Sequence, residues 1–238
     1  MSGLFVTGTD TGVGKTVVAA AIIAALRSHG VAVRALKPVI TGLDETPDPD
    51  WPRDHELLAR TADSKAADTM LVGYGPPVSP HLAAELAGKP IDPRALVAAA
   101  RAIIAASQTA IVEGVGGLLV PLTDAYDVRA FARELALPIL IAARPGLGTI
   151  NHPLLTLEAG RDAGLEIAGV VLTPWPENPT EIERSNRETI SRVGRVTVST
   201  LAPIERADAA LLAAAGRELP LDSWLTAAPR FRPERELA

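Results

Sequence analysis

The chain has 238 residues, with 23 lysines and arginines against 28 aspartates and glutamates, a formal net charge of −5. Its length and its 47% hydrophobic content fit one α/β domain with a packed core, and the acidic balance argues against binding to nucleic acid or a membrane surface. The absence of cysteine excludes disulfides, thiol catalysis and cysteine-bound metals.

Strand-like and helix-like segments alternate from the first residues onward. The chain opens on a strand pattern without a secretion signal, and its most apolar run, Val17–Leu26, is too short to span a bilayer, so we expect a cytoplasmic protein. The strand patterns are continuous apolar runs, which are typical of a parallel sheet covered on both faces. We expect strands at Gly3–Thr7, Val33–Ile40, Thr109–Glu113, Leu137–Ala142, Ile167–Leu172 and, more weakly, Arg195–Leu201. We expect helices at Lys15–His29, Asp54–Thr61, Pro93–Ala106, Asp124–Leu135, Thr149–Ala163 and Glu181–Arg192.

This order predicts a doubly wound α/β fold with a mostly parallel sheet and helices on both faces. Asp92 before Pro93 predicts a helix N-cap, and Thr180 with Glu183 predicts a capping box. The proline-rich segment Gly42–Arg53 and the segment Gly73–Pro80 predict surface loops. We expect one domain over residues 1–226 and a charged, frayed tail over 227–238.

A glycine-rich loop, GTDTGVGKT at residues 8–16, lies between the first strand and the first helix. Glycines let successive N–H groups turn toward an anion, and the helix N-terminus adds positive potential. Lys15 is expected to reach the β- and γ-phosphates and Thr16 to ligate Mg²⁺. Strand, loop and helix together predict a P-loop, so the α/β fold is expected to be P-loop NTPase-like. The loop is one residue longer than the usual P-loop spacing, and a glycine-rich turn without a ligand is the alternative interpretation. The expected nucleotide contacts here are Gly12, Val13, Gly14, Lys15, Thr16 and Val17.

Two common classes of P-loop protein fit poorly. No Asn-Lys-x-Asp run is present, which a GTPase needs to read guanine. Partition-type ATPases usually carry a second lysine early in the loop, where this chain has Thr9-Asp10-Thr11.

Further polar residues follow the second and third predicted strands. Because ligands of parallel sheets bind beyond the carboxyl ends of the strands, Lys37 and Thr41 are expected to face the γ-phosphate. Glu113, followed by Gly114-Val115-Gly116-Gly117, is a candidate Mg²⁺ ligand. The alternatives are a solvated lysine at a strand end, a surface acid near a turn and, for Asp54, a simple helix cap.

Five runs together closely resemble the dethiobiotin synthetase family of biotin synthesis. They keep the family's order and cover residues 3 to about 175, and their combination is far more specific than a P-loop alone. The runs are Gly-Thr-Asp-Thr-x-x-Gly-Lys-Thr at 8–16, Lys-Pro-Val-x-x-Gly at 37–42, Ser-Pro-His at 79–81, Val-Glu-Gly-x-Gly-Gly at 112–117 and Gly-x-Ile-Asn-His at 148–152.

The resemblance implies an ATP-dependent cyclo-ligase that uses Mg²⁺. The family converts 7,8-diaminononanoate, CO₂ and ATP to dethiobiotin, ADP and phosphate through a carbamate and a carbamic-phosphoric anhydride. It implies catalytic roles for Lys15, Lys37 and Thr11, and a substrate contact for Thr41. It also implies that Thr16, Asp54 and Glu113 hold Mg²⁺ and, with Gly114, Val115 and Gly116, contact the nucleotide.

The family is also a homodimer whose active site lies at the interface. The resemblance implies that Gly148, Thr149, Ile150 and Asn151, which open a helix, bind the substrate's carboxylate across that interface. The alternative for Asn151 is a simple helix cap.

Nucleobase recognition departs from the family's pattern. The family commonly places an Asn-Asp pair after the fifth strand, where the amide reads adenine, and this chain has Thr173 and Pro174. We therefore expect weak discrimination among nucleoside triphosphates, with any base contacts made by Thr173, Pro174, Ala202, Pro203 and Ile204.

Two other functions are weighed against this one. A cobyrinate-type amidotransferase synthetase usually has a fused glutaminase domain with a nucleophilic cysteine, which this chain lacks. A nucleotide-switched, partner-binding P-loop ATPase predicts slow hydrolysis stimulated by a protein or membrane, whereas a synthetase requires diaminononanoate and bicarbonate.

Overall fold

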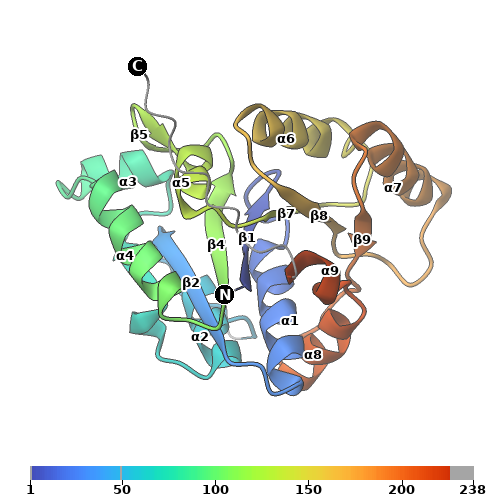
Figure 1. Ribbon diagram of the computed structural model, residues 1–238, viewed down its shortest axis with the longest axis horizontal. Helices are drawn as coiled ribbons and strands as arrows, with labels where there is room; N and C mark the ends of the chain where they lie inside the picture. The colour runs from blue at the N-terminus through green and yellow to red at the C-terminus, as the bar shows by residue number, and fades with distance from the viewer. Residues whose placement is uncertain (1, 49, 226–238) are drawn as a thin grey trace.

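Seven strands form one parallel sheet in the order β3-β2-β4-β1-β7-β8-β9, and β5 and β6 form a separate antiparallel pair (Figure 1). The computed structural model describes residues 2–48 and 50–225. The parallel pairing agrees with the continuous apolar runs of the sequence. The strands are β1 (Ser2–Gly8), β2 (Val33–Ile40), β3 (Met70–Gly73), β4 (Thr109–Gly117), β5 (Pro121–Thr123), β6 (Tyr126–Asp127), β7 (Ile139–Ala143), β8 (Ile167–Leu172) and β9 (Val198–Thr200).

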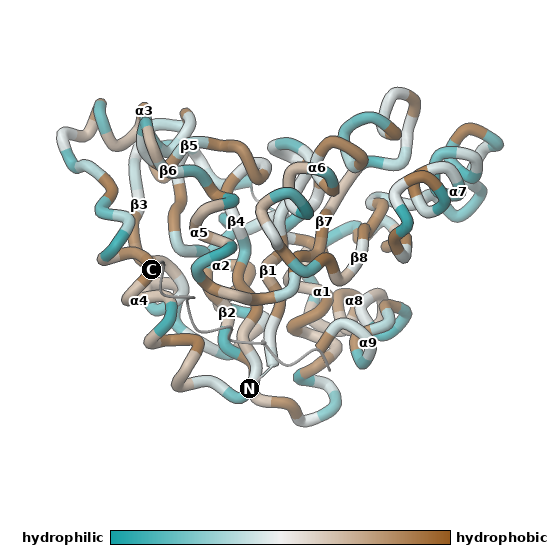
Figure 2. The backbone as a smooth tube through the Cα atoms, turned by 45° about the horizontal axis from the view of Figure 1, so that its top comes forward, coloured by the Kyte–Doolittle hydropathy of each residue, from teal (hydrophilic) through white to brown (hydrophobic). Residues whose placement is uncertain are grey.

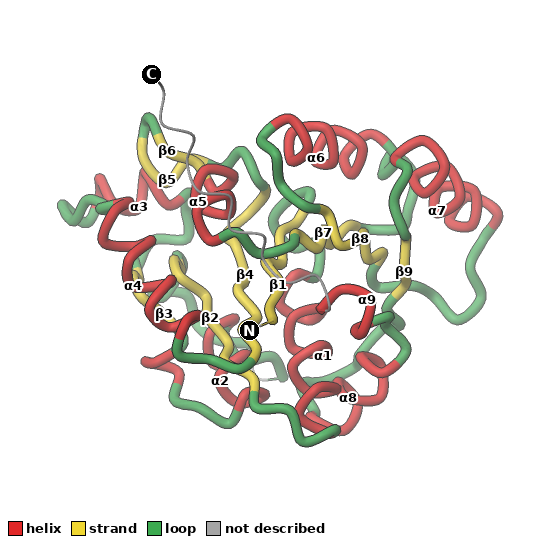
Figure 3. The backbone as a smooth tube through the Cα atoms, viewed as in Figure 1, coloured by secondary structure: helices red, strands yellow, loops and turns green. Residues whose placement is uncertain are grey.

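Helices cover both faces of this sheet (Figure 3), as predicted. One face is covered by α1 (Lys15–Ser28), α2 (Asp54–Ala62), α8 (Ala209–Arg217) and α9 (Leu221–Leu225). The other face is covered by α4 (Pro93–Ala105), α5 (Val128–Leu135), α6 (Asn151–Asp162) and α7 (Glu181–Gly194). The short helix α3 (Pro80–Leu86) contacts β5, and a 3₁₀ turn spans Ala66–Asp68.

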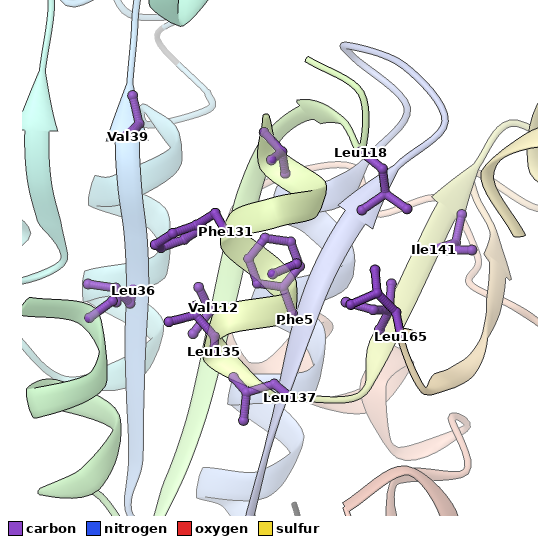
Figure 4. Close-up of a cluster of buried hydrophobic side chains, with 14 of the residues drawn as sticks. Phe5, Leu36, Val39, Val112, Leu118, Phe131, Leu135, Leu137, Ile141 and Leu165 are labelled. Carbon is purple, nitrogen blue, oxygen red and sulfur yellow. The ribbon is translucent and has the colours of Figure 1, made fainter. Parts of the chain in front are cut away.

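The alternation of side chains along each strand builds two cores, one on each face. In β1, Leu4 and Val6 pack toward α1, and Phe5 between them packs toward α5. The Phe5 ring lies edge-on to Phe131 at a centroid distance of 6.2 Å (Figure 4). Hydrophobic residues accordingly follow the central strands and α1 (Figure 2). The β1 strand, from whose end the glycine-rich loop departs, is therefore fixed from both sides.

The predicted strands and helices are all present, with shifted ends. The strand expected to end at Glu113 continues to Gly117. The helix expected from Asp124 begins only at Val128, because Asp124 lies in the turn between β5 and β6 and Asp127 caps the helix. The expected strand Arg195–Leu201 shortens to β9, since Arg195 still belongs to the C-cap of α7. The Asp92 cap and the Thr180–Glu183 capping box are confirmed.

Several elements were not expected from the sequence: β3, α3, the β5–β6 pair, α8 and α9. The first three are short, and the segment Gly73–Pro80 is a loop only between β3 and α3. In α8, Gly216 lets the helix approach α1 closely, because a Cβ there would come within 2.0 Å of the Ala21 carbonyl oxygen. The domain boundary at residue 226 stays a prediction, and the expected tail, 227–238, lies outside the described residues.

Candidate active site

The loop between β1 and α1 presents a helix N-terminus that no side chain caps. Gly14 occupies the N-cap position of α1 with φ of 90°, a left-handed conformation that glycine adopts without strain. A Cβ at Gly14 would also lie 2.7 Å from the Thr173 methyl group, so this position has no room for a side chain. The first N–H groups of α1 are therefore open to an anionic ligand.

The register of two neighbouring strands brings Lys37 and Glu113 together. Leu36 in β2 pairs with Val112 in β4, so the next residue of each strand lies at the same level. Lys37 follows Ala35, and Glu113 follows Ile111, at the two-residue spacing of one sheet face, so both side chains lie on the α1 side. Both are buried, with exposed fractions of 3% for Lys37 and 0% for Glu113. The alternatives of a solvated strand-end lysine and a surface acid at a turn are therefore wrong, because both residues lie inside their strands.

A compact network of charged side chains connects the two strands to α1 and α2. Lys37 Nζ lies 2.5 Å from Glu113 Oε1, 2.9 Å from Asp54 Oδ2 and 3.1 Å from the Gly114 carbonyl oxygen. The Thr16 hydroxyl donates to the same two carboxylates, at 2.8 Å from Asp54 Oδ1 and 3.0 Å from Glu113 Oε1. Asp54 is the first residue of α2 rather than its cap, which is Arg53, so the simple-cap alternative is also wrong.

The two lysines of the site are held differently. Burial alone would lower the pKa of Lys37, but the carboxylates of Asp54 and Glu113 outweigh it and raise this pKa above its ordinary value. Burial lowers the pKa of Lys15, and the nearby Lys37 charge lowers it further. Lys15 Nζ donates only to the Asp10 carbonyl oxygen, at 2.7 Å, among the hydrogen bonds of the described residues. Lys37 is thus locked in an ion pair, whereas Lys15 has no carboxylate in contact.

The pKa values of the two carboxyl groups are also shifted by their surroundings. Burial opposes ionisation of Asp54, but Lys37 and the Thr16 hydroxyl lower its pKa, and its side chain remains 45% exposed. Burial raises the pKa of Glu113, against the opposing influence of Lys37. One Glu113 oxygen, Oε2, is buried without a hydrogen-bond partner. The site therefore contains a carboxylate oxygen with an unused lone pair, next to a hydroxyl and a second carboxylate.

A cavity of about 760 Å³ opens above this network. Its wall brings together much of the site predicted from the sequence, from the glycine-rich loop, β2, α2 and the end of β4. The predicted residues that line it are Thr11, Gly12, Gly14, Lys15, Thr16, Val17, Lys37, Thr41, Asp54, Val115 and Gly116.

Other lining residues were not assigned a role from the sequence. They include Glu45, Trp51 and Pro52, from the loop predicted as surface, and Ser79 at the start of α3. Ser79 belongs to one of the runs shared with the resembled family, which was the available signal for it. Trp51 carried no signal, because nothing in the sequence indicates that this loop folds over the cavity.

The remaining predicted residues do not line the cavity. Asn151 is exposed and begins α6 without capping it, since the N-cap position belongs to Ile150, so the cap alternative is wrong. Thr149 is buried and donates to the Arg144 carbonyl oxygen at 2.5 Å, and the Arg144 guanidinium donates to the Gly12 carbonyl oxygen at 3.3 Å. Arg144, which the sequence analysis missed, thereby connects the segment 144–151 to the glycine-rich loop.

The segments expected at the nucleobase lie apart from the charged network. Thr173 is only 3% exposed, and its methyl group packs against the Gly14 backbone. Ala202 and Pro203 are exposed beyond β9, and Ile204 packs against the α1-side core. Among Thr173, Pro174 and Ala202–Ile204, only Thr173 has a polar side chain, and one hydroxyl does not supply the paired donor and acceptor that a base edge needs.

The residues fit a magnesium ion bound with a nucleotide. Among the described residues, no group of three or more histidine, cysteine, aspartate or glutamate side chains forms a complete metal cluster. The oxygens of Thr16, Asp54 and Glu113 instead form an incomplete set of hard ligands, including the unpartnered Glu113 Oε2. Mg²⁺ prefers such a site, where one or two carboxylates act together with phosphate oxygens and water.

A parallel sheet whose first strand leads through a glycine-rich loop into an uncapped helix defines a P-loop NTPase fold. Solved structures of this class are similar: the cell division ATPase MinD of Pyrococcus furiosus has a TM-score of 0.51 and 18% identity and covers 98% of this chain and 93% of that one. A cobyrinic acid a,c-diamide synthase of Mycobacterium smegmatis has a TM-score of 0.52 and 19% identity, with 91% of each chain covered. At these identities the likeness concerns the fold alone.

Sequence relatives define the family. A family model described as an AAA domain matches residues 2–209. An ATP-dependent dethiobiotin synthetase of Anaeromyxobacter dehalogenans is 45% identical over 72% of this chain and 76% of its own. One from a Mycobacterium species is 40% identical over 98% and 97%, and one from Bacillus subtilis subsp. natto is 36% identical over 85% and 87%. The chain belongs to the dethiobiotin synthetase family. Among the described residues, none of the helices has the length and apolar character needed to cross a bilayer.

Proposed function

We propose that this chain catalyses the ATP-dependent carboxylation and ring closure of 7,8-diaminononanoate, giving dethiobiotin, ADP and phosphate. The observation that carries the proposal is a cluster of charged and hydroxyl side chains beside an open helix N-terminus. Lys15, Thr16, Lys37 and Asp54 line one 760 Å³ cavity, and the buried Glu113 contacts Lys37 and Thr16 beneath it. The full-length match to relatives named for this activity supports it.

The reaction needs no protein nucleophile. One substrate amine attacks CO₂, supplied as such or from bicarbonate, and loses a proton to give a carbamate. A carbamate oxygen then attacks the γ-phosphorus of ATP, and ADP leaves. The second amine attacks the resulting mixed anhydride, so that the ureido ring closes and phosphate and a proton depart. The protein contributes positioning and charge stabilisation.

The side chains at the cavity suit these steps. Lys15 would meet the β- and γ-phosphates, because it is buried at the start of α1 and makes no carboxylate contact. Lys37 would stabilise the carbamate and the migrating phosphoryl group, both of which are anionic. The hydroxyls of Thr11 and Thr41 line the same cavity and would hydrogen-bond to the carbamate and the substrate nitrogens.

We also propose that Thr16, Asp54 and Glu113 hold the Mg²⁺ that accompanies the nucleotide. When bound, this ion neutralises charge on the β- and γ-phosphates and orients them for transfer. The protein's part is to supply one hydroxyl and two carboxylates from α1, α2 and β4, three elements that the sheet holds in fixed relation.

The substrate's carboxylate requires a further surface, which we propose a second copy of the chain supplies. Gly148–Asn151 do not line the cavity of their own chain. Leu119 and Leu155 are 59% and 55% exposed and line a groove of about 380 Å³ that also includes Thr9, Asp10 and Thr11. Exposed leucines beside a P-loop support a homodimer with the active site at its interface.

Coexpression of two inactive variants tests the shared site. Lys37→Ala removes the ammonium group on one side, and Asn151→Asp puts a carboxylate where the substrate's own carboxylate is proposed to bind. Random pairing makes half of the dimers mixed, and each mixed dimer holds one intact site, so about a quarter of wild-type activity returns. Activity no higher than that of the separate variants, or a monomeric chain in light scattering, contradicts the shared site.

The function itself is tested by measuring dethiobiotin, ADP and phosphate with and without diaminononanoate and bicarbonate. We expect one ADP and one phosphate for each dethiobiotin, and little ATP turnover when either compound is omitted. ATP hydrolysis that is indifferent to both compounds would instead favour a nucleotide-switched, partner-binding ATPase.

A further inference from the structure

The ammonium group of Lys37 contacts carboxylate oxygens of the two acids that we assign to Mg²⁺. Its Nζ contacts Glu113 Oε1 at 2.5 Å and Asp54 Oδ2 at 2.9 Å, and the Thr16 hydroxyl contacts the other Asp54 oxygen and the same Glu113 oxygen. Two of the three proposed magnesium ligands, Asp54 and Glu113, thus already contact a cation, and that cation belongs to the protein.

We infer that Lys37 is the resting counter-ion of Asp54 and Glu113, and that a divalent cation entering with nucleotide phosphates displaces its ammonium group into the cavity. The inference rests on the proposed function only in its consequence, because the released ammonium group then meets the carbamate. The exchange itself concerns the protein, the metal and the nucleotide.

Electrostatics makes the two cations competitors. A divalent ion and an ammonium group that contact the same carboxylate oxygens repel each other at short range, and burial weakens the screening of that repulsion. With Lys37 in place, one of the two carboxylate charges is already compensated, and the ammonium group contacts an oxygen of each carboxylate. The phosphates of a nucleotide add negative charge and further oxygen ligands, which favour the divalent ion.

The displaced side chain has somewhere to go. Lys37 and Thr41 both line the 760 Å³ cavity, so the ammonium group reaches that space by rotation about its side-chain bonds without movement of β2. An order of events follows. Lys37 cannot serve the carbamate while it pairs with Glu113, so the metal and nucleotide must be in place first.

Lys15 provides a matched control. It carries the same charge into the same cavity, but its Nζ donates to the Asp10 carbonyl oxygen and contacts neither carboxylate. Removing Lys15 therefore changes the potential of the cavity without freeing the metal's ligands. A comparison of the two lysines separates displacement from a general effect of charge.

The experiment measures binding of Mn²⁺ to the nucleotide-free chain by electron paramagnetic resonance at pH 8. We expect Lys37→Met to bind Mn²⁺ about tenfold or more tightly than the wild type, and Lys15→Met to differ from the wild type by about threefold or less. Adding Glu113→Gln to Lys37→Met is expected to remove the gain. Binding by Lys37→Met that is no tighter than binding by Lys15→Met overturns the inference.

A second measurement uses the wild type, so that the test survives if Lys37→Met fails to fold. Crystals are grown with Mn²⁺ alone and with Mn²⁺ and a non-hydrolysable ATP analogue, and anomalous scattering locates the metal. We expect Mn²⁺ at Asp54 and Glu113 only with the analogue, and Lys37 turned away from Glu113 in that crystal. Mn²⁺ bound there while Lys37 keeps its contact with Glu113 overturns the exchange. Both measurements omit diaminononanoate, so their outcome is independent of whether the chain forms dethiobiotin.

Discussion

The carboxyl edge of the sheet consists of two regions that are built differently. Around β2, β4 and β1, the functional side chains contact one another within the chain, through the network of Lys37, Asp54, Glu113 and Thr16. Around β7, β8 and β9, the predicted residues are either buried under the glycine-rich loop, as Thr173 is, or exposed away from the cavity, as Asn151 is.

The difference shows which parts of such a site the fold alone determines. Strand register and helix packing fix the first region, because every member lies within or directly beside a regular element. The second region depends on loops, and we propose that its residues form a site only together with a nucleotide or a second chain. In this proposal phosphate chemistry resides in the first, rigid region, and recognition of the base and of the substrate's far end resides in the other.

The rigid region can be broken most severely by removing the buried ammonium group. Lys37→Met leaves Glu113 fully buried without its counter-ion, and loss of one partner of a buried ion pair typically costs about 3–5 kcal/mol. In the variant, the influence of Lys37 that opposes the raised pKa of Glu113 is gone, so this pKa rises further. Urea unfolding at pH 8 and at pH 5 measures the free energy of unfolding.

The sign of the pH dependence follows from that raised pKa. A carboxyl whose folded-state pKa lies above its unfolded value of 4.5 stabilises the fold at low pH, and this stabilisation is lost as the pH rises through the folded value. The deficit of Lys37→Met relative to the wild type is therefore larger at pH 8 than at pH 5. Lys37→Met with Glu113→Gln recovers stability at pH 8. An equal deficit at both pH values contradicts an unpaired Glu113 carboxylate as its cause.

The same lysine can be tested through catalysis. We expect Lys37→Ala to lower dethiobiotin formation by about 10²–10³-fold, because removal of one group that stabilises transition-state charge has effects of this size. Steady-state turnover is measured at a temperature where circular dichroism shows the variant to be folded. Near-normal turnover in a folded variant leaves Lys37 with a structural role only.

The sequence predicted which residues meet in the rigid region, whereas the roles of the residues in the other region stay predictions, for physical reasons. The rule that parallel strands collect ligands at their carboxyl ends was enough to place Lys37 and Glu113 near the glycine-rich loop, and the family resemblance added Asp54. It could not show that Lys37 points at Glu113, because that depends on the register between β2 and β4. Trp51 and Arg144 reach the cavity and the glycine-rich loop from irregular segments, whose paths no local pattern specifies.

Some helices and strands could not be predicted from the sequence for the same reason. The apolar run in α8 has no distinctive sequence pattern. Its close packing on α1 at Gly216 accounts for the helix. The strand β3 and the pair β5–β6 have two to four residues each, which is too few for any periodicity to appear.

A smaller effect is expected at the carboxylates that we assign to Mg²⁺. Asp54→Asn and Glu113→Gln each keep the shape of the side chain but weaken its attraction for a divalent ion. Each is expected to raise the Mg²⁺ concentration needed for half-maximal activity by about tenfold or more. Titration of MgCl₂ at fixed ATP measures this value, and Glu45→Gln, which changes another acid lining the cavity, is the control. Unaltered metal dependence in both variants refutes the assignment.

The smallest effect concerns the nucleobase and sharpens the contrast between the two regions. We assign phosphate recognition to the glycine-rich loop, Lys15 and the proposed metal site, none of which would sense the base. Thr173, at the position where the family commonly has an amide, is 3% exposed with its methyl group against Gly14, and Pro174 lacks a backbone donor. A site without paired donors and acceptors has no polar group of its own to leave without a hydrogen-bond partner when the wrong base binds, so it discriminates weakly among nucleobases. We expect ATP, CTP, GTP and UTP to support turnover with kcat/KM values within about tenfold, or roughly 1.4 kcal/mol, at saturating Mg²⁺. A preference for ATP beyond a hundredfold instead assigns adenine recognition to backbone groups near Ala202 and Pro203, and the second region would then be as specific as the first.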